Sequence, residues 1–274
     1  MEIGSRFGPS TRDLRARRTR RLGVALALAL AAVVLIVPTT EARIDAHGAG
    51  TNGDVSGDLG IQDFPAWYED EGAVYGSPLR LEPCVDSVDL CGLVGDPPFD
   101  ELIYWTGGAL ITQGGVKVLF VAAAEGAYLN GGVVAGEEIT FGRIRVKGRG
   151  LRANKWYRVT HPYGTQLVRA DGRGRFAVTD DIGCFALDCD FANALESPVF
   201  QSFLRWDGTL PAPSPGHIGD PLVDHTVTGS PTGNNFFKIE GVSPGLPGSF
   251  NLGPTGMRMT DLFSVAGQCQ GSCP

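Results

Sequence analysis

The sequence ITFGRIRV, residues 139–146, is rich in β-branched and aromatic residues, and basic and apolar side chains alternate in its second half, from Arg143 to Val146. Turn-forming residues separate it from three further short runs, KWYRVTH (155–161), TQLVRA (165–170) and RFAVTD (175–180). Short runs rich in β-branched and aromatic residues, bounded by glycine, proline or aspartate, are typical of β-strands. Residues 139–180 therefore predict four consecutive strands, and Asp171–Gly172 predicts a hairpin between the last two.

The same pattern continues on both sides of this region. VKVLFVAA (116–123) precedes it, and NNFFKIEG (234–241) and TDLFSVAG (260–267) follow it. Helix is scarce, with one short candidate at CDFANALE (189–196), which Pro198 ends. Strands without alternating long helices predict an all-β fold, an antiparallel β-sandwich of the immunoglobulin-like or jelly-roll-like kind.

The N-terminal region has the order of a secretory signal peptide. Seven arginines precede an apolar run of 14 residues, Val24 to Val37, and small residues follow. A membrane-spanning helix needs about 20 residues, so the run predicts a cleaved signal peptide, residues 1–42, with Ala46 as the second choice of cleavage site. An uncleaved anchor is the alternative.

The rest of the chain divides by composition. We predict a flexible leader at 43–63, a main β-sandwich domain at 64–211 and a proline-rich connector at 212–222. Residues 223–274 are expected to form a C-terminal β segment that packs on the sandwich or completes it. One domain or two both fit this division.

The charge balance limits the range of partners. Without residues 1–42 the chain has 16 basic and 27 acidic residues, a net charge of −11. Such acidity argues against specific nucleic-acid recognition. No second apolar run is long enough to span a membrane, so contact with a membrane is expected only through the signal segment.

The cysteines indicate disulfide bonds. An even number of cysteines in an exported chain is typical of disulfides, and six allow 15 connectivities. Short loops close most easily. We therefore predict the three local pairs, Cys84–Cys91, Cys184–Cys189 and Cys269–Cys273.

Four aspartates surround the second pair in the sequence DDIGCFALDCD, residues 180–190. We predict no cofactor here, because the spacing fits neither a zinc site nor an EF-hand. The alternative is a surface calcium site formed by Asp180, Asp181, Asp188 and Asp190.

One basic region interrupts the acidic trend. Between Arg143 and Arg175 there are ten basic residues and one acid. Because residues i and i+2 of a strand share a face, Arg143, Arg145 and Lys147 predict a basic stripe opposite a buried apolar face. The stripe is a candidate site for a polyanion; the alternative is an ordinary solvated face.

Aromatic residues recur as neighbours, at Trp67–Tyr68, Tyr104–Trp105 and Trp156–Tyr157. Neighbours in a strand face opposite sides, so one member of each pair is expected in the core, and the other is expected to be exposed or covered by a second sheet. An exposed aromatic ring can stack on a sugar, which makes Trp156 a second candidate for ligand binding.

The sequence carries no complete catalytic motif, such as H-E-x-x-H or a P-loop, and we predict no catalytic residue. The alternative hypothesis is a secreted hydrolase whose site is assembled from distant residues, around His161 or around His217 and His225.

Several blocks of sequence resemble an uncharacterised family of exported bacterial β-rich proteins. They are FPAWYED, YRVTHPYGT, DDIGCFALDCDF, FLRWD, GHIGDP, HTVTGSPTGNNFFKIEG and TDLFSVAG. The resemblance covers most of residues 64–266 and implies bacterial origin, export and β-rich domains, without supplying any site residue. We expect a secreted or cell-surface protein that acts as a non-catalytic binding or structural module for a glycan or polyanionic polymer.

Overall fold

The computed structural model describes residues 52–85, 88–91, 98–242 and 257–273. The described residues all belong to one compact unit of the chain. The predicted signal peptide and the first part of the predicted leader, residues 43–51, lie outside the described residues.

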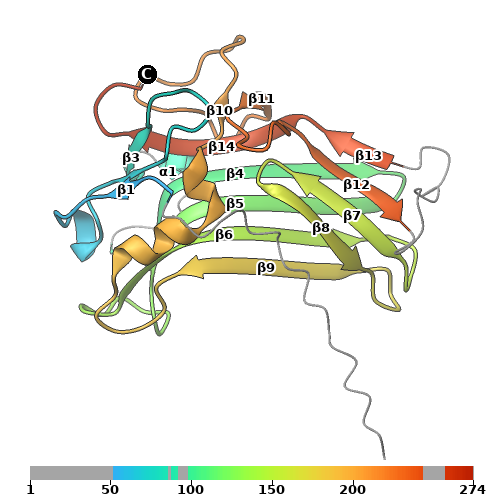
Figure 1. The fold of residues 1–274 in the computed structure, drawn as a ribbon, viewed down its shortest axis with the longest axis horizontal. Helices are drawn as coiled ribbons and strands as arrows, with labels where there is room; N and C mark the ends of the chain where they lie inside the picture. Colours follow the sequence, from blue (N-terminus) through green and yellow to red (C-terminus); the bar gives the residue numbers. More distant parts are fainter. Residues whose placement is uncertain (1–51, 86–87, 92–97, 243–256, 274) are drawn as a thin grey trace, which may run out of the picture. The chain divides into compact units, whose positions relative to one another are not determined.

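The described residues form an antiparallel β-sandwich, as the sequence predicts (Figure 1). The larger sheet has ten strands in the order β1-β2-β3-β14-β4-β5-β6-β9, with β11 paired to β14 and β10 paired to β11. Its strands are β1 (Asp54–Val55), β2 (Tyr68–Glu69), β3 (Arg80–Glu82), β4 (Glu101–Gln113), β5 (Val116–Tyr128), β6 (Glu138–Arg149), β9 (Phe176–Gly183), β10 (Arg205–Trp206), β11 (His225–Thr228) and β14 (Leu262–Cys269).

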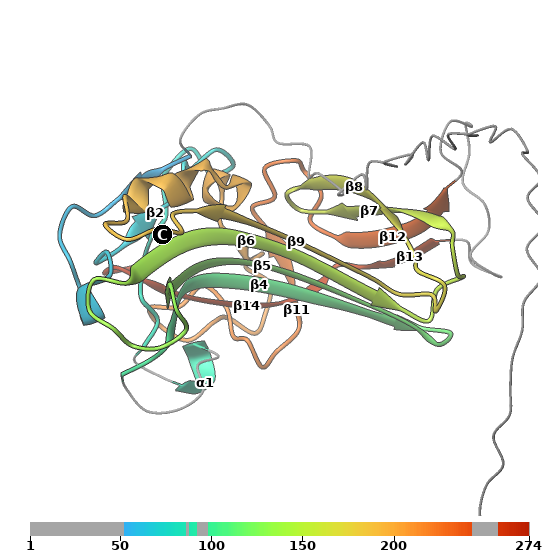
Figure 2. The same cartoon turned by 90° about the horizontal axis from the view of Figure 1, so that it is seen from below.

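The smaller sheet has four strands in the order β13-β12-β7-β8. They are β7 (Trp156–His161), β8 (Gly164–Arg169), β12 (Phe237–Val242) and β13 (Met257–Thr260). Figure 2 shows this sheet over one end of the long strands, while the 3-10 helices η2 (Phe191–Glu196) and η3 (Pro198–Gln201) cover the other end of the same face. The opposite face of β4, β5, β6 and β9 is the outer face of the sandwich.

A two-residue turn organises the centre of the larger sheet. Gly114 and Gly115 join β4 to β5 and both have positive φ, 58° and 79°. A tight hairpin turn needs this left-handed backbone, which glycine adopts without steric cost. The turn fixes the register in which Leu110 lies opposite Leu119, and therefore also which side chains meet on the outer face.

The hairpin predicted at Asp171–Gly172 is wrong, because β8 and β9 belong to different sheets. The Asp-Gly turn is present, but the chain crosses from the smaller sheet to the larger there. The crossing from β6 to β7 runs beside it, and the Leu151 N–H donates to the carbonyl of Gly174 at 3.0 Å. A Cβ on Gly174, where φ is 70°, would collide with the Leu151 carbonyl oxygen, so this corner needs glycine.

The core lies between the two sheets and is rich in aromatic rings. Phe120 of β5 stacks on His161 of β7, with ring centroids 5.0 Å apart, and packs on Phe237 of β12 at 5.5 Å. Trp105 stacks on Phe203 at 5.6 Å. Burial of each such side chain stabilises the fold by about 1.5–3 kcal/mol. The contacts of Phe120 with His161 and Phe237 therefore hold the two sheets together.

The neighbouring pair Tyr104–Trp105 departs from the expected alternation, since both side chains are fully buried. A register shift between Ile103 and Trp105 interrupts the pairing of β4 with β5. Such a bulge lets two successive side chains point inward. At Trp156–Tyr157 the alternation is confirmed, with Tyr157 buried and Trp156 partly exposed.

The helix predicted at residues 189–196 forms as the 3-10 helix η2, capped by the Asp190 carboxylate, which accepts a hydrogen bond from the Ala192 N–H. The α-helix α1 (Val88–Cys91) is one turn long. The C-terminal strands enter both sheets, because β12 and β13 belong to the smaller and β14 to the larger.

The described part of the predicted leader also differs from a flexible segment. β1 pairs with β2, and the Asn52 N–H donates to the carbonyl of Leu195 at 2.8 Å. The predicted connector packs on β14 through hydrogen bonds such as that from the Ile218 N–H to the Gly267 carbonyl. Short polar segments thus become ordered by pairing with strand edges that the sequence does not reveal.

Candidate functional site

The outer face of the larger sheet carries the basic residues of β6. Ile144 and Val146 point inward and are 2% and 0% exposed. Arg145 and Lys147 alternate with them and lie on the outer face. The predicted alternation along residues 143–147 is therefore confirmed.

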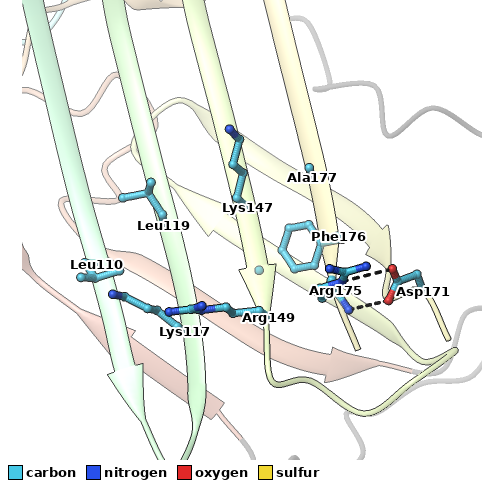
Figure 3. Close-up of a pocket in the computed structure, with 10 residues that line it drawn as sticks. Leu110, Lys117, Leu119, Lys147, Arg149, Asp171, Arg175, Phe176 and Ala177 are labelled. Carbon is cyan, nitrogen blue, oxygen red and sulfur yellow. Dashed lines mark hydrogen bonds and ion pairs between the residues drawn. The ribbon is translucent and has the colours of Figure 1, made fainter. Parts of the chain in front are cut away.

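A pocket of about 620 Å³ lies on this face, beside the crossing from β8 to β9 (Figure 3). We call it the basic groove. It is lined by Leu110, Lys117, Leu119, Lys147, Gly148, Arg149, Asp171, Arg175, Phe176 and Ala177. The strand register places Leu110, Leu119, Lys147 and Ala177 in one row across four strands, and Lys117 opposite Arg149 in the next row.

The charge of the basic groove is strongly positive. Four of its side chains are cations, and its one acid, Asp171, already has partners. The Asp171 carboxylate accepts the backbone N–H groups of Arg173 and Arg175 at 2.8 Å and pairs with the Arg175 guanidinium at 3.6 Å. The Arg175 N–H and then the Arg173 N–H hold the pKa of Asp171 below its usual value.

Three cations of the basic groove have no such partner. Within the described parts of the chain, Lys117, Lys147 and Arg149 make no ion pair with an acid. Lys117 and Arg149 also lie directly opposite each other, and like charges in that position destabilise a sheet. A bound anion would relieve this repulsion.

The floor of the basic groove is apolar. Leu110 and Leu119 lie side by side and are 46% and 38% exposed. Phe176 borders the groove, and its ring packs against Gly148 and the core. The groove thus offers apolar surface beside unpaired positive charge.

Arg143, the first residue of the predicted stripe, is not available to a ligand. Its guanidinium donates to the Glu125 carboxylate at 2.7 Å and to both carboxylate oxygens of Asp181 at 2.8 and 2.9 Å. We call these residues the Glu125–Arg143–Asp181 cluster. Burial raises the pKa of Glu125 to about 7, although Arg143 opposes that rise.

The other predicted ligand-binding residues are divided between the two sheets. Arg145 donates to the Thr179 hydroxyl at 3.3 Å on the outer face of the larger sheet, next to the basic groove. Lys147 lines the groove itself. Trp156 lies in the smaller sheet, opposite Arg169 and Val242, so the structure does not bring it together with the stripe.

Sequence reasoning did not single out Lys117, Arg149 or Arg175 as site residues. Arg149 continues the i, i+2 alternation of β6, so the sequence pattern that predicts Lys147 on the outer face also predicts Arg149 there. Lys117 belongs to another strand, and its position opposite Arg149 follows from the sheet register. Arg175 reaches the groove because the chain crosses between sheets at the preceding turn.

The four aspartates considered as calcium ligands do not converge. Asp180 and Asp181 are successive residues of β9 and so point to opposite faces. Asp181 binds Arg143, and Asp190 caps η2. In residues 52–85, 88–91, 98–242 and 257–273, no three His, Cys, Asp or Glu side chains group as metal ligands.

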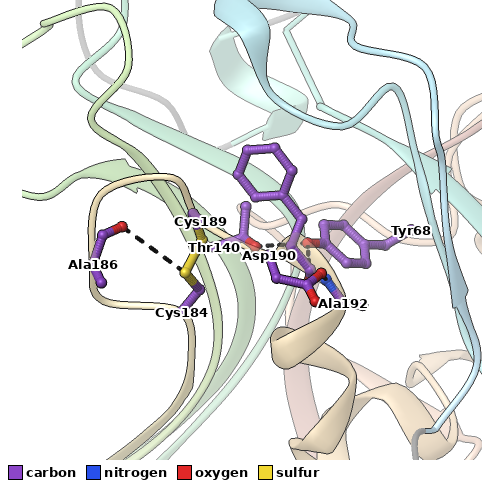
Figure 4. The surroundings of a disulfide bond; sticks show 8 residues. Tyr68, Thr140, Cys184, Ala186, Cys189, Asp190 and Ala192 are labelled. Atoms are coloured by element: carbon purple, nitrogen blue, oxygen red, sulfur yellow. Dashed lines mark hydrogen bonds between the residues drawn. A yellow bond between two sulfur atoms is a disulfide. The ribbon is translucent and has the colours of Figure 1, made fainter.

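The three predicted disulfides are confirmed: Cys84–Cys91, Cys184–Cys189 and Cys269–Cys273. Figure 4 shows the second one closing the loop that leads from β9 to η2. Beside it, the Tyr68 hydroxyl hydrogen-bonds Thr140 at 2.6 Å and donates to the Phe191 carbonyl at 2.8 Å. The sequence DDIGCFALDCD is therefore a closed loop anchored next to a buried tyrosine.

His161, one candidate for a hydrolase site, is fully buried. Its Nδ1 accepts the Tyr163 N–H at 3.2 Å, and its ring stacks on Phe120. Burial lowers its pKa to about 3, so it is neutral at physiological pH. A general base must be able to reach a substrate proton, and His161 lies in the core instead.

His217 and His225, the other hydrolase candidates, lie apart. They pair with Gln268 and Phe263, which are five residues from each other along the chain. Five residues of a strand correspond to roughly 17 Å. His225 stacks on Trp206, and its Nε2 is 3.4 Å from the Thr209 hydroxyl, which donates instead to Asp207 at 2.7 Å. This arrangement holds the ring of His225 in place.

In the described part of the chain, no helix is long and apolar enough to cross a membrane. Comparison with protein-family models, curated proteins and solved structures finds no match to this chain. The basic groove combines a pocket with three cations that no described acid pairs with, and the function proposed below is based on this combination.

Proposed function

We propose that this protein is an exported, non-catalytic binding module that holds an anionic polymer or acidic glycan in the basic groove. The observation that carries the proposal is the set of unpaired cations, Lys117, Lys147 and Arg149, around one pocket. In a chain with a net charge of −7, acids are plentiful, yet none of those described pairs with these three side chains.

Electrostatics explains why such a site would select a polymer. At about 4 Å in water, one pair of unit charges gains about 1 kcal/mol, which is weak by itself. A polymer presents several charges to several cations at once, so these contributions accumulate. The acidic remainder of the protein repels the polymer elsewhere and directs it to the groove.

Three disulfides support placing this activity outside the cytoplasm, since disulfides persist in oxidising compartments. The signal-peptide pattern of residues 1–42 and the resemblance to exported bacterial proteins agree with a secreted or cell-surface location. A polyanionic or glycan partner at that location would belong to a cell surface or its surroundings.

The test compares two double variants with equal loss of charge. K147Q/R149Q removes two cations of the groove, and K155Q/R169Q removes one lysine and one arginine that are exposed elsewhere. We expect the groove variant to bind heparin about tenfold more weakly than the wild type at 0.15 M salt, and the control variant to bind as the wild type does. The measurement is isothermal titration at several salt concentrations.

Equal effects of the two double variants would contradict the proposal, because binding would then follow net charge. Absence of salt-dependent binding in the wild type would contradict it as well, since attraction between exposed charges is screened over about 10 Å at 0.1 M salt and about 3 Å at 1 M salt.

A further inference from the structure

The basic groove has a second property besides charge, and it narrows the chemistry of the ligand. The surface of the pocket is mostly apolar, because Leu110, Leu119, Phe176 and Ala177 form much of it. Long lysine and arginine side chains add their aliphatic stems to such a surface. A ligand made of charge alone would leave this apolar surface in water.

The apolar and cationic residues of the groove lie directly beside each other, and Lys117 is two residues from Leu119 on the same face of β5. Leu110 and Leu119 lie on β4 and β5, while Lys147 and Arg149 lie on the adjacent strand β6 (Figure 3). Neighbouring strands are about 4.8 Å apart, so an acid group on Lys147 and an apolar group on Leu119 would be within one small ring of each other. The ligand must therefore carry an apolar face directly beside its acid group.

Two kinds of ligand carry an apolar part beside an acid group, a fatty acid and an acidic sugar. The groove is open to solvent, and this openness favours the sugar. An acyl chain is apolar on all sides, and an open surface would leave half of it in contact with water. A pyranose ring has an apolar C–H face and polar hydroxyl edges, so it loses nothing when its other side stays in water. The partly exposed Leu110 and Leu119 suit a ring that covers them from one side.

We infer that the basic groove binds an acidic glycan, with a sugar ring packed on Leu119 and Leu110 and its carboxylate or sulfate group against Lys147, Arg149 and Lys117. This inference rests on the proposed function and specifies its ligand. Linear polyphosphate has the charge without the ring, and a fatty acid has an acid group with an acyl chain. These two compounds are therefore the comparison probes.

The experiment measures the affinity of the purified protein for polygalacturonate, linear polyphosphate and dodecanoate at equal salt, expressed per charged group. We expect polygalacturonate to bind about tenfold more tightly than polyphosphate. Leu119→Thr keeps a strand-forming residue and removes most of the apolar contact, so it should weaken glycan binding about fivefold and leave polyphosphate binding unchanged.

Leu167→Thr provides the matched control, because Leu167 is 43% exposed on the smaller sheet and does not line the groove. It should leave all affinities unchanged. Far-UV circular dichroism and a urea titration check that each variant is folded, and Leu119→Gln replaces Leu119→Thr if the latter unfolds.

Different results would overturn the acidic-glycan inference and the proposed polyanion-binding function. Equal binding of polyphosphate and glycan, with no effect of Leu119→Thr, would overturn the inference and leave the proposed function standing. Tighter binding of dodecanoate than of either polymer would also overturn the inference. No binding of any polyanion, or binding that K147Q/R149Q does not weaken, would overturn the proposed function itself.

Discussion

Two cations on the same face of β6 differ in whether an acidic side chain pairs with them. Arg143 is enclosed by Glu125 and Asp181 and is 16% exposed. Lys147 lies four residues further along the same face of β6. Its neighbours in the adjacent strands are Ala177 of β9 and Leu119 of β5, and neither carries a charge. The strand that carries both residues is the same, so the difference arises from its neighbours.

This comparison shows what separates a structural cation from one that can bind a ligand. A buried charge must be paired, because removing it from water costs several kcal/mol. Arg143 meets that requirement inside the protein. Lys147 and Arg149 remain solvated and unpaired, so an external anion can pair with them without first breaking an internal contact.

The largest effect is expected when Arg143 loses its charge. Arg143→Gln leaves the buried Glu125 carboxylate and the partly buried Asp181 carboxylate without their partner. Loss of one member of a buried ion pair costs roughly 3–5 kcal/mol. Urea unfolding should show a fall in stability of that size. Lys147→Gln, on the same strand face, should change stability by no more than about 0.5 kcal/mol.

Similar stability losses for the two substitutions would contradict the distinction drawn here. A double-mutant cycle sharpens the test, since Glu125→Gln in the Arg143→Gln background removes one of the stranded charges and should recover part of the lost stability.

The next largest effect is a dependence of folding stability on pH, which arises from Glu125 in the Glu125–Arg143–Asp181 cluster. Burial raises the pKa of Glu125 from 4.5 to about 7 in the folded protein. Between those values the folded state binds more protons than the unfolded state, so stability contributed by this group falls as pH rises through that window. The shift corresponds to roughly 3 kcal/mol. Glu125→Gln should remove this part of the pH dependence.

The measurement is the difference in unfolding free energy between wild type and Glu125→Gln at pH 4.5 and pH 7.5. The variant should gain relative to the wild type as pH rises. A constant difference would show that Glu125 titrates normally, and that it is less buried than the cluster requires. Asp181→Asn serves as the control, because it removes the other carboxylate that binds Arg143 and leaves Glu125 in place, so the pH dependence should remain.

Much of the fold was predictable because it depends on local patterns. Alternation in residues 143–147 predicts a strand with its apolar side inward, and close cysteine pairs predict local disulfides; both are confirmed. The choice of sheet for each strand was not predictable from such patterns. Asp171–Gly172 makes the expected turn, yet the strands on its two sides separate into different sheets.

The candidate site was predictable only in part for the same reason. Lys147 follows from the alternation along one strand. Whether a cation is paired depends on the register with neighbouring strands, which places Asp181 opposite Arg143 and Ala177 opposite Lys147. The pairing of Glu125 with Arg143 could not be predicted from the sequence either. Glu125 lies at the end of the apolar run VAAA in β5, and its partner Arg143 is 18 residues away.

The central claim is that Lys147 belongs to a binding site because no carboxylate lies across from it. Ala177→Glu places one there and so gives Lys147 the kind of partner that Asp181 gives Arg143. The affinity for heparin, measured by titration at 0.15 M salt, should fall about fivefold, since one added charge near the anion costs about 1 kcal/mol. Ala177→Gln, of equal size without the charge, should lose less affinity than Ala177→Glu. Wild-type affinity in Ala177→Glu, or equal losses in the two variants, would contradict the claim.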